Sequence, residues 1–235
     1  MPRGPWIMKQ EWHDLLFAHW AVPADVVRPL IPRALEIDTF GGRAWLGVVP
    51  FRMSGVRMRG MPAIPGFSRF AELNVRTYAV RDGKPGVWFF SLDAANPVAV
   101  WGARRFFQLP YFLAAMSCAE NAGWIRYENH RKDRRGSAAS LRARYRAVGE
   151  IFHAQPGSIE HFLAERYCLY TADEKRRIIR CEIHHPPWAL QLAEAELQEN
   201  TMAAAAGITI ADLKPELLHF SRHQEVVVWA PQVLK

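Results

Sequence analysis

Residues 71–80 carry the clearest strand pattern in the chain, and this pattern limits the fold more than any other feature. Successive side chains of a strand point to opposite faces. The pattern therefore separates two faces: Leu73, Val75, Thr77 and Ala79 on one, and Glu72, Asn74, Arg76 and Tyr78 on the other. The polar face would meet water in an open sheet, or would line the cavity of a closed ring of strands. The period alone leaves both arrangements open.

The rest of the chain continues in short apolar runs separated by turn residues. The 16 Pro and 15 Gly are spread along the sequence, and half of the residues are hydrophobic. An Asp-Gly turn at 81–84 leads from the first strand into a second at 87–92. Because β-rich chains of 235 residues commonly form one domain, we expect a single domain over residues 1–235. Its class should be mainly β (α+β), with a few short helices.

Further elements are expected from runs of the same kind. Residues 53–69 show no clear period and should form a long loop, either at the surface or as a wall of a site. The expected strands are 12–20, 35–38, 44–51 and 188–197, with hairpins 125–130/140–146, 166–170/177–184 and 217–221/225–229, and the expected helices are 23–32, 156–165 and 198–206.

The central stretch 103–116 places Arg104 and Arg105 directly before an aromatic run that contains Tyr111 and ends at Met116. A pair of arginines beside an apolar wall suits the binding of a small organic anion. The alternative is that both arginines are solvated charges at the start of a helix that packs on the sheet.

Several residue types near this stretch could support chemistry. Glu72 could act as a base or orient a substrate, and Asp93 lies at the end of a strand. A tyrosine beside cations can have a lowered phenol pKa, which would help Tyr111 in proton transfer.

Charge and composition bear on partners and location. The formal net charge is +7, and Arg142, Arg144 and Arg146 form one face of a predicted strand. A solvated strand is favoured over a nucleic-acid groove there, because the flanking loops lack the aromatic residues that stack bases. No signal segment or membrane-length apolar run is visible. We therefore expect a cytoplasmic protein without a membrane partner.

The sequence offers no signature of a metal or cofactor site. His184 and His185 are adjacent on a strand and point to opposite faces, and the pair His219 and His223 lacks the helix and the glutamate of a zincin. Gly-x-Ser-x-Gly and phosphate-binding glycine loops are absent. We expect no metal and no cofactor. The three cysteines, Cys118, Cys168 and Cys181, are expected to be reduced thiols.

The run from Ala103 to Phe112 resembles the signature of acetoacetate decarboxylase, Gly-Arg-Glu-x-x-Gly-x-Pro-Lys-Lys. Arg104 and Pro110 match it, whereas Tyr111 stands where the family has its Schiff-base lysine and Phe112 replaces the neighbouring lysine. Glu72 resembles the strand glutamate of that family's site. Because a tyrosine cannot form an imine, the resemblance implies that Schiff-base decarboxylase activity is absent.

Over nearly its full length the chain resembles uncharacterised bacterial proteins of the YqjF type, within the acetoacetate decarboxylase-like superfamily. That likeness implies an antiparallel β-cone or barrel with a central, mostly apolar cavity. The segments that carry it are 20–23, 44–51, 72–78, 89–94 and 109–111.

Together these features predict a protein that binds a small, anionic organic molecule. Arg104 would pair with the anion, Glu72 would orient it or accept a proton, and the Tyr111 hydroxyl would replace the amine. Catalysis, if present, would be proton-transfer or lyase chemistry. The alternatives are a non-catalytic ligand sensor or protein-binding module, and nucleic-acid binding through 142–146; a homo-oligomer stays open. The further binding residues expected are Asn74, Arg76, Asp93, Arg105 and Met116.

Overall fold

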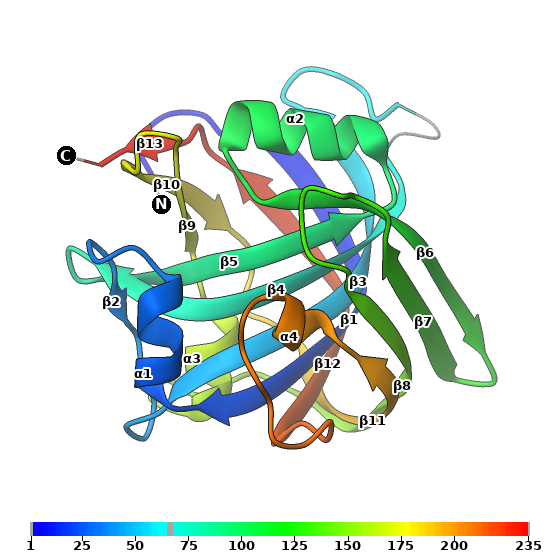
Figure 1. Ribbon diagram of the computed structural model, residues 1–235. Coiled ribbons are helices and arrows are strands. Elements are labelled where there is room, and N and C mark those ends of the chain that lie inside the picture. The colour runs from blue at the N-terminus through cyan, green and yellow to red at the C-terminus, as the bar shows by residue number, and fades with distance from the viewer. Residues whose placement is uncertain (1, 65–67, 235) are drawn as a thin grey trace.

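The computed structural model describes residues 2–64 and 68–234, and strands dominate it (Figure 1). The predicted mainly β class with few short helices is confirmed. The strands are β1 Met8–Val22, β2 Glu36–Ile37, β3 Ala44–Met58, β4 Phe70–Arg81, β5 Lys84–Ala94, β6 Tyr111–Asn121, β7 Trp124–Arg131, β8 Ser140–Phe152, β9 Cys168–Ala172, β10 Ile178–His184, β11 Leu190–Asn200, β12 Leu217–Val228 and β13 Gln232–Val233. The helices are α1 Ala24–Val27, the 3₁₀ turn Arg28–Leu30, α2 Pro97–Phe107, α3 Ile159–Ala164 and α4 Met202–Ala205.

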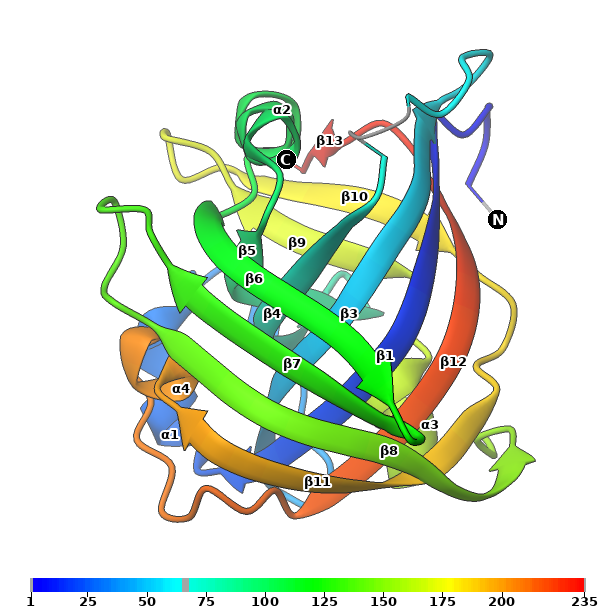
Figure 2. The same cartoon turned by 90° about the vertical axis from the view of Figure 1, so that its right-hand side faces the viewer.

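Five strands, in the order β12-β1-β3-β4-β5, form a wall that two closed rings of strands share. The free edge of β12 pairs with β11 near Phe220 and with β10 near Val228. The free edge of β5 likewise pairs in parallel with β9 at Val87 and with β6 at Leu92. Strands β6, β7, β8 and β11 close one ring and face the viewer in Figure 2, whereas β9 and β10 close the other.

The two rings have different contents. The ring closed by β6, β7, β8 and β11 holds the largest apolar core, which includes Leu73 and Val75 of β4 together with Tyr127 and Tyr145. The ring closed by β9 and β10 surrounds a cavity. Strand β4 lies between the two and is buried without a break from residue 72 to residue 79. Its polar face therefore turns into a cavity rather than toward bulk water.

Helix α2 lies over one end of the rings (Figure 1). It begins where the Asn96 side chain accepts hydrogen bonds from the backbone N–H groups of Val98 and Ala99, with Pro97 in the first turn. It ends at Gln108, which takes the left-handed conformation with φ of 55°. Arg104 and Arg105 therefore lie in the last turn, where cations interact favourably with the helix dipole. The interpretation that they open a helix is wrong.

Two other predictions are wrong, because the strands extend beyond the apolar runs from which they were predicted. Residues 217–228 form one strand rather than a hairpin, because pairing with β1 continues from Val228 to Leu217. Arg222, which falls between the two predicted strands, is exposed on this continuous strand. Strand β3 extends to Met58 through an irregularity near Gly55, so residues 53–58 are strand and not loop.

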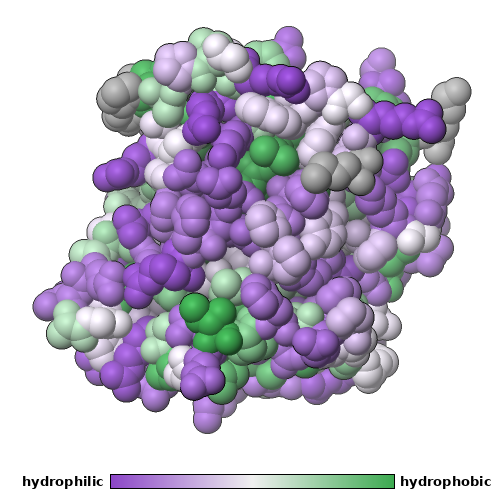
Figure 3. Space-filling model, turned by 180° about the vertical axis from the view of Figure 1, so that it is seen from behind, coloured by the Kyte–Doolittle hydropathy of each residue, from purple (hydrophilic) through white to green (hydrophobic). Residues whose placement is uncertain are grey.

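The surface on the side opposite to that of Figure 1 is mostly hydrophilic, and hydrophobic residues form small separate groups there (Figure 3). In the part of the chain that the structure describes, no helix combines the length and the apolar character needed to cross a membrane. All three cysteines are free thiols.

A buried ion pair between Asp93 of β5 and Arg131 of β7 fixes the strands around β6. The Asp93 and Arg131 side chains are 0% and 2% exposed. Arg131 Nη2 and Nε donate to Asp93 Oδ1 over 2.7 and 3.0 Å, and Asn129 donates to Oδ2 over 3.0 Å. The Phe112 ring covers the guanidinium, with its centroid 4.3 Å away. Each charge is thus compensated and hydrogen-bonded, as buried ions require.

We expect Asp93→Ala to lower the free energy of unfolding by about 3–5 kcal/mol, because Arg131 would stay buried without a counter-ion. Urea unfolding of the full chain measures the loss. Glu194→Ala is the matched control, since it breaks an ion pair with Arg146 in which the Glu194 side chain is 51% exposed. Losses of equal size in the two variants would contradict the role given to Asp93.

Candidate functional site

The cavity has a volume of about 430 Å³ and mostly apolar walls. Its size falls in the range of small-molecule sites, ~300–1,000 Å³. Aromatic side chains from the strand wall and from the segment before β11 form much of the lining, among them Trp12, Phe17, Phe51 and Trp188. Such a lining favours the apolar part of a ligand.

The mouth of the cavity is apolar and exposed. Trp101 and Phe106 of α2 are 62% and 59% exposed, and Met61 and Ile64 of the β3–β4 connection are each 55% exposed. All four line the cavity, and α2 and this connection lie at the same end of the molecule in Figures 1 and 2. The expected role of part of 53–69 as a wall of the site is supported by Met61 and Ile64; residues 65–67 lie outside the described residues.

Strand β4 supplies the principal polar groups. Glu72, Asn74 and Arg76 all line the cavity, because residues two apart share a face of a strand. The residues between them, Leu73 and Val75, belong to the core of the other ring. The structure thus selects the cavity-lining alternative for the polar face of this strand.

Glu72 and Tyr111 are brought together. The Tyr111 hydroxyl donates a hydrogen bond of 2.8 Å to Glu72 Oε2, and both residues are buried. Burial raises the pKa of Glu72 to about 8, although the hydrogen bond from Tyr111 opposes the shift. At neutral pH this carboxyl is therefore mostly protonated and can give up its proton within the physiological range.

The pKa of Tyr111 is raised well above its ordinary value, by burial and by the neighbouring Glu72 carboxyl. The expectation of a lowered phenol pKa is wrong, because the hydroxyl faces a carboxyl and not a cation. Tyr111 therefore stays a neutral hydrogen-bond donor.

Arg76 is a buried cation without a carboxylate partner among the described residues. Its residue is 9% exposed, its Nη2 donates to the Leu163 carbonyl over 3.1 Å, and its Nε has no hydrogen-bond partner. The guanidinium lies 5.3 Å from the centroid of Phe17. Two other arginines of the lining have partners, since Arg166 pairs with Asp38 and Arg57 lies 4.0 Å from Glu11.

The described residues around Arg76 leave it room but give it no negative charge. Gly47 lies beside it, and a Cβ there would come within 3.2 Å of Arg76 Cγ and 3.0 Å of His19 Nε2. Burial lowers the pKa of His19 well below its ordinary value, with further contributions from Arg76 and His219. His19 is therefore neutral. Nearby on the same strand, Asn74 Oδ1 is buried and accepts no hydrogen bond.

The structure keeps the remaining candidate residues away from this group. Arg104 lies outside the cavity, where its Nη1 donates to the Tyr111 carbonyl over 2.9 Å. Arg105 is exposed on α2, and Met116 lies in a separate surface depression beside Cys118. Asp93 is held by Arg131 and does not line the cavity. Glu72, Asn74, Arg76 and Tyr111 are thus the candidates that share one site.

Sequence reasoning missed much of the lining, including Arg166, His185 and Trp188. These three come from the segments around β9 and before β11, and nothing in the local sequence signals that the second ring carries them to β4. In the described part of the chain the cavity wall contains no lysine and no cluster of metal-ligating side chains.

Comparisons with known proteins agree with this architecture. Residues 9–225 match the model of the DUF2071 family, described as an uncharacterized conserved protein. The chain is 46% identical over 229 residues to the uncharacterized protein YqjF of Bacillus subtilis (strain 168), covering 97% of this chain and 93% of that one.

Several solved structures share the fold at low identity. The enduracididine biosynthesis enzyme MppR, complexed with pyruvate, is 12% identical with a TM-score of 0.64 over 100% of this chain and 92% of that one. Acetoacetate decarboxylase of Legionella pneumophila is also 12% identical, with a TM-score of 0.62 over 100% of this chain and 88% of that one. The expected likeness to acetoacetate decarboxylase is thereby confirmed for the fold.

The raised pKa of Glu72 predicts how stability depends on pH. Unfolded, the carboxyl loses its proton near pH 4.5, but folded it keeps the proton up to about pH 8. The free energy of unfolding should therefore fall as the pH rises from 4.5 to 8, by roughly 3–5 kcal/mol from this group. Glu72→Gln should remove that part of the dependence in urea unfolding at pH 5, 6.5 and 8.

Glu194→Gln, an exposed acid on β11, serves as the control and should keep the pH dependence of the wild type. Parallel curves for the wild type and Glu72→Gln would show that the Glu72 pKa is not raised.

Proposed function

The chain belongs to the DUF2071 family of uncharacterized conserved proteins, and we propose that its cavity binds a small organic carboxylate with an apolar body. The observation that carries the proposal is the Arg76 guanidinium, a buried cation to which the described residues supply no carboxylate. A buried charge is costly unless it is paired. A ligand carboxylate would provide the missing charge and accept from the unpartnered Nε.

The shape of the site suggests how such a ligand would lie. Its carboxylate would meet Arg76, and a donor group on the ligand would meet the free Oδ1 of Asn74. Its apolar body would contact the aromatic walls and extend toward the mouth at Trp101. The pyruvate with which MppR is complexed is a small carboxylate of this class, and MppR has a similar fold.

Arg76 takes the role that the sequence suggested for Arg104. Both are arginines, but only Arg76 lines the cavity. Arg104 instead bonds a backbone carbonyl on the outside of the α2–β6 junction. A test of the anion site can therefore use the two residues as a matched pair.

We expect the protein to prefer a carboxylate over the amide of the same shape. Pyruvate, hexanoate and phenylacetate, each compared with its amide, should raise the unfolding temperature or bind in calorimetry only as the acid. Arg76→Met keeps the volume but removes the charge, and should weaken carboxylate binding about tenfold or more. Arg104→Met should bind as the wild type does.

The proposal fails if no acid of the panel is preferred over its amide, or if the preference survives in Arg76→Met. A preference lost in Arg104→Met alone would restore the assignment made from the sequence.

A second candidate function, proton transfer on the bound acid, is favoured by the Glu72–Tyr111 pair. Glu72 has a pKa of about 8 in an apolar site, which suits a group that exchanges protons near neutral pH. As a carboxylate it would accept a proton from a carbon next to a carbonyl group. Glu72 would become neutral and the negative charge would pass to the ligand as an enolate, while the Tyr111 hydrogen bond would stabilise the ionised Glu72 that precedes this step.

If Glu72 is such a base, the protein should speed the exchange of pyruvate methyl protons for deuterium, followed by proton NMR in D₂O. The rate should rise with pH through about 8, because only the ionised carboxyl accepts a proton. Glu72→Gln should abolish the effect. Tyr111→Phe should move the rise to higher pH, because the hydrogen bond that it removes lowers the Glu72 pKa.

Exchange that matches the rate without protein would reject catalysis on this substrate and leave the binding proposal standing, since the amide comparison tests binding separately. Binding without turnover corresponds to the ligand-sensor alternative.

Observations on the outer surface bear on the remaining alternatives. Arg144 and Arg146 pair with Glu196 and Glu194, each with a contact of 2.6 Å, and both stack on Trp124 at 4.7 Å. Their charge is largely compensated, which speaks against nucleic-acid binding by residues 142–146. A cytoplasmic location, a single domain and a homo-oligomer stay predictions.

A further inference from the structure

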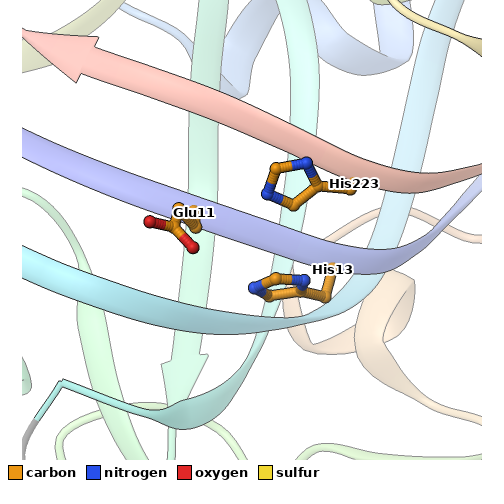
Figure 4. A group of neighbouring side chains, drawn as sticks. All are labelled: Glu11, His13 and His223. Atoms are coloured by element: carbon orange, nitrogen blue, oxygen red, sulfur yellow. The ribbon is translucent and has the colours of Figure 1, made fainter.

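Two histidines and a glutamate from different strands meet on the outer face of the strand wall. Glu11 and His13 share one face of β1, and His13 lies directly opposite His223 of β12 in the antiparallel pairing. Figure 4 shows the three side chains on the same side of the strands, with ring nitrogens of both imidazoles turned toward the Glu11 carboxylate. The neighbours in sequence, Gln10 and Trp12, line the cavity on the opposite side.

The three groups are close enough to share an ion. One potential ligand atom from each lies within 4.8 Å of the other two, and the two imidazole centroids are 5.0 Å apart. Ser54 of β3 lies among them: its Oγ is 2.7 Å from His13 Nε2 and 3.4 Å from Glu11 Oε2. His13 and Glu11 therefore point at one spot.

The backbone holds this arrangement and leaves room for it. Residues 55 and 11 are close, since a Cβ on Gly55 would lie 2.9 Å from Glu11 Oε1, and the φ of Gly55 is +60°. Glycine is the residue that takes this conformation without strain, and its missing side chain leaves the space that the carboxylate occupies. The Glu11 carboxylate also lies 4.0 Å from Arg57, whose Nη1 bonds the Gly55 carbonyl.

The cations near the cluster have acidic partners, and Arg57 lies 4.0 Å from Glu11 itself. Lys9 pairs with Glu225, and Arg52 and Arg222 both pair with Asp14. His223 is exposed and makes a ring contact with His13. One face of the cluster is thus open to solvent.

We propose that Glu11, His13 and His223 form a Zn²⁺ site that joins β1 to β12. Two imidazoles and one carboxylate are a ligand set that zinc uses, with the fourth position left to water or to the Ser54 hydroxyl. The ligand atoms around a tetrahedral zinc ion lie about 3.4 Å from one another. Side-chain rotations that move the ligand atoms of Glu11, His13 and His223 by about an ångström would bring them to this spacing. The assignment differs from the expectation of no metal, and it does not depend on the function of the cavity.

Calorimetry on full-length protein, freed of metal and without a histidine tag, tests this assignment with ZnCl₂ as the titrant. The wild type should bind one Zn²⁺ per chain, and Zn²⁺ should raise its unfolding temperature, because a ligand that binds the folded state stabilises it. Co²⁺, used as a spectroscopic probe, should give a visible absorption band that Zn²⁺ removes.

His223→Ala and Glu11→Gln should each lose the Zn²⁺ binding, the thermal shift and the Co²⁺ band. Because His223 is exposed, its replacement should leave the unfolding temperature without metal unchanged. His130→Ala removes an exposed histidine of β7 and should keep all three signals. A wild type that binds no Zn²⁺ at this stoichiometry, or a His223→Ala variant that binds as the wild type does, would overturn the assignment.

Discussion

The wall β12-β1-β3-β4-β5 is shared by two rings, and this sharing is the constraint on which the rest of the structure depends. Strand β4 lies between the two rings and has no face on bulk water in its central part, so it is buried from residue 72 to residue 79. One face joins an apolar core and needs no polar partners. Every polar group on the other face must be satisfied by a neighbour, by loss of its charge, or by a ligand.

Three buried ionisable groups differ in how their charge is compensated, and the difference indicates where the site lies. Arg131 is paired with Asp93 and held by bonds to it, so that pair is structural. Glu72 avoids a buried charge because burial raises its pKa to about 8. Arg76 shows neither arrangement, because the described residues offer its guanidinium no carboxylate and leave its Nε without a hydrogen-bond partner. The described lining of the cavity therefore contains one buried cation, the Arg76 guanidinium, that lacks a negative partner. This position is where a function is best sought.

The sequence predicted the strand class, the Asp-Gly turn and the two faces of 71–80, because these depend on local period and turn chemistry. It also singled out Glu72 and Tyr111, which meet at 2.8 Å. It misplaced Arg104 because a local motif does not tell which side of α2 faces the cavity. The prediction of a hairpin within 217–228 was wrong for a similar reason. Exposed polar residues in the middle of a strand, such as Arg222, give the same local pattern as a turn. Cross-strand pairs such as His13 and His223 depend on register, which no single segment encodes.

Strand β1 contributes to both proposed sites on its opposite faces, and the faces change over at Asp14. Before it, Gln10 and Trp12 face the cavity, and after it Leu15 and Phe17 do so, which shifts the alternation by one residue. Asp14 takes a φ of 55°, a conformation that is unfavourable for a non-glycine residue. Arg52 and Arg222 bond its carboxylate, and the Tyr145 hydroxyl donates to its carbonyl over 2.8 Å. These bonds fix the irregularity, so Trp12 and Phe17 both face the cavity while Glu11 and His13 lie on the outer face of the same strand.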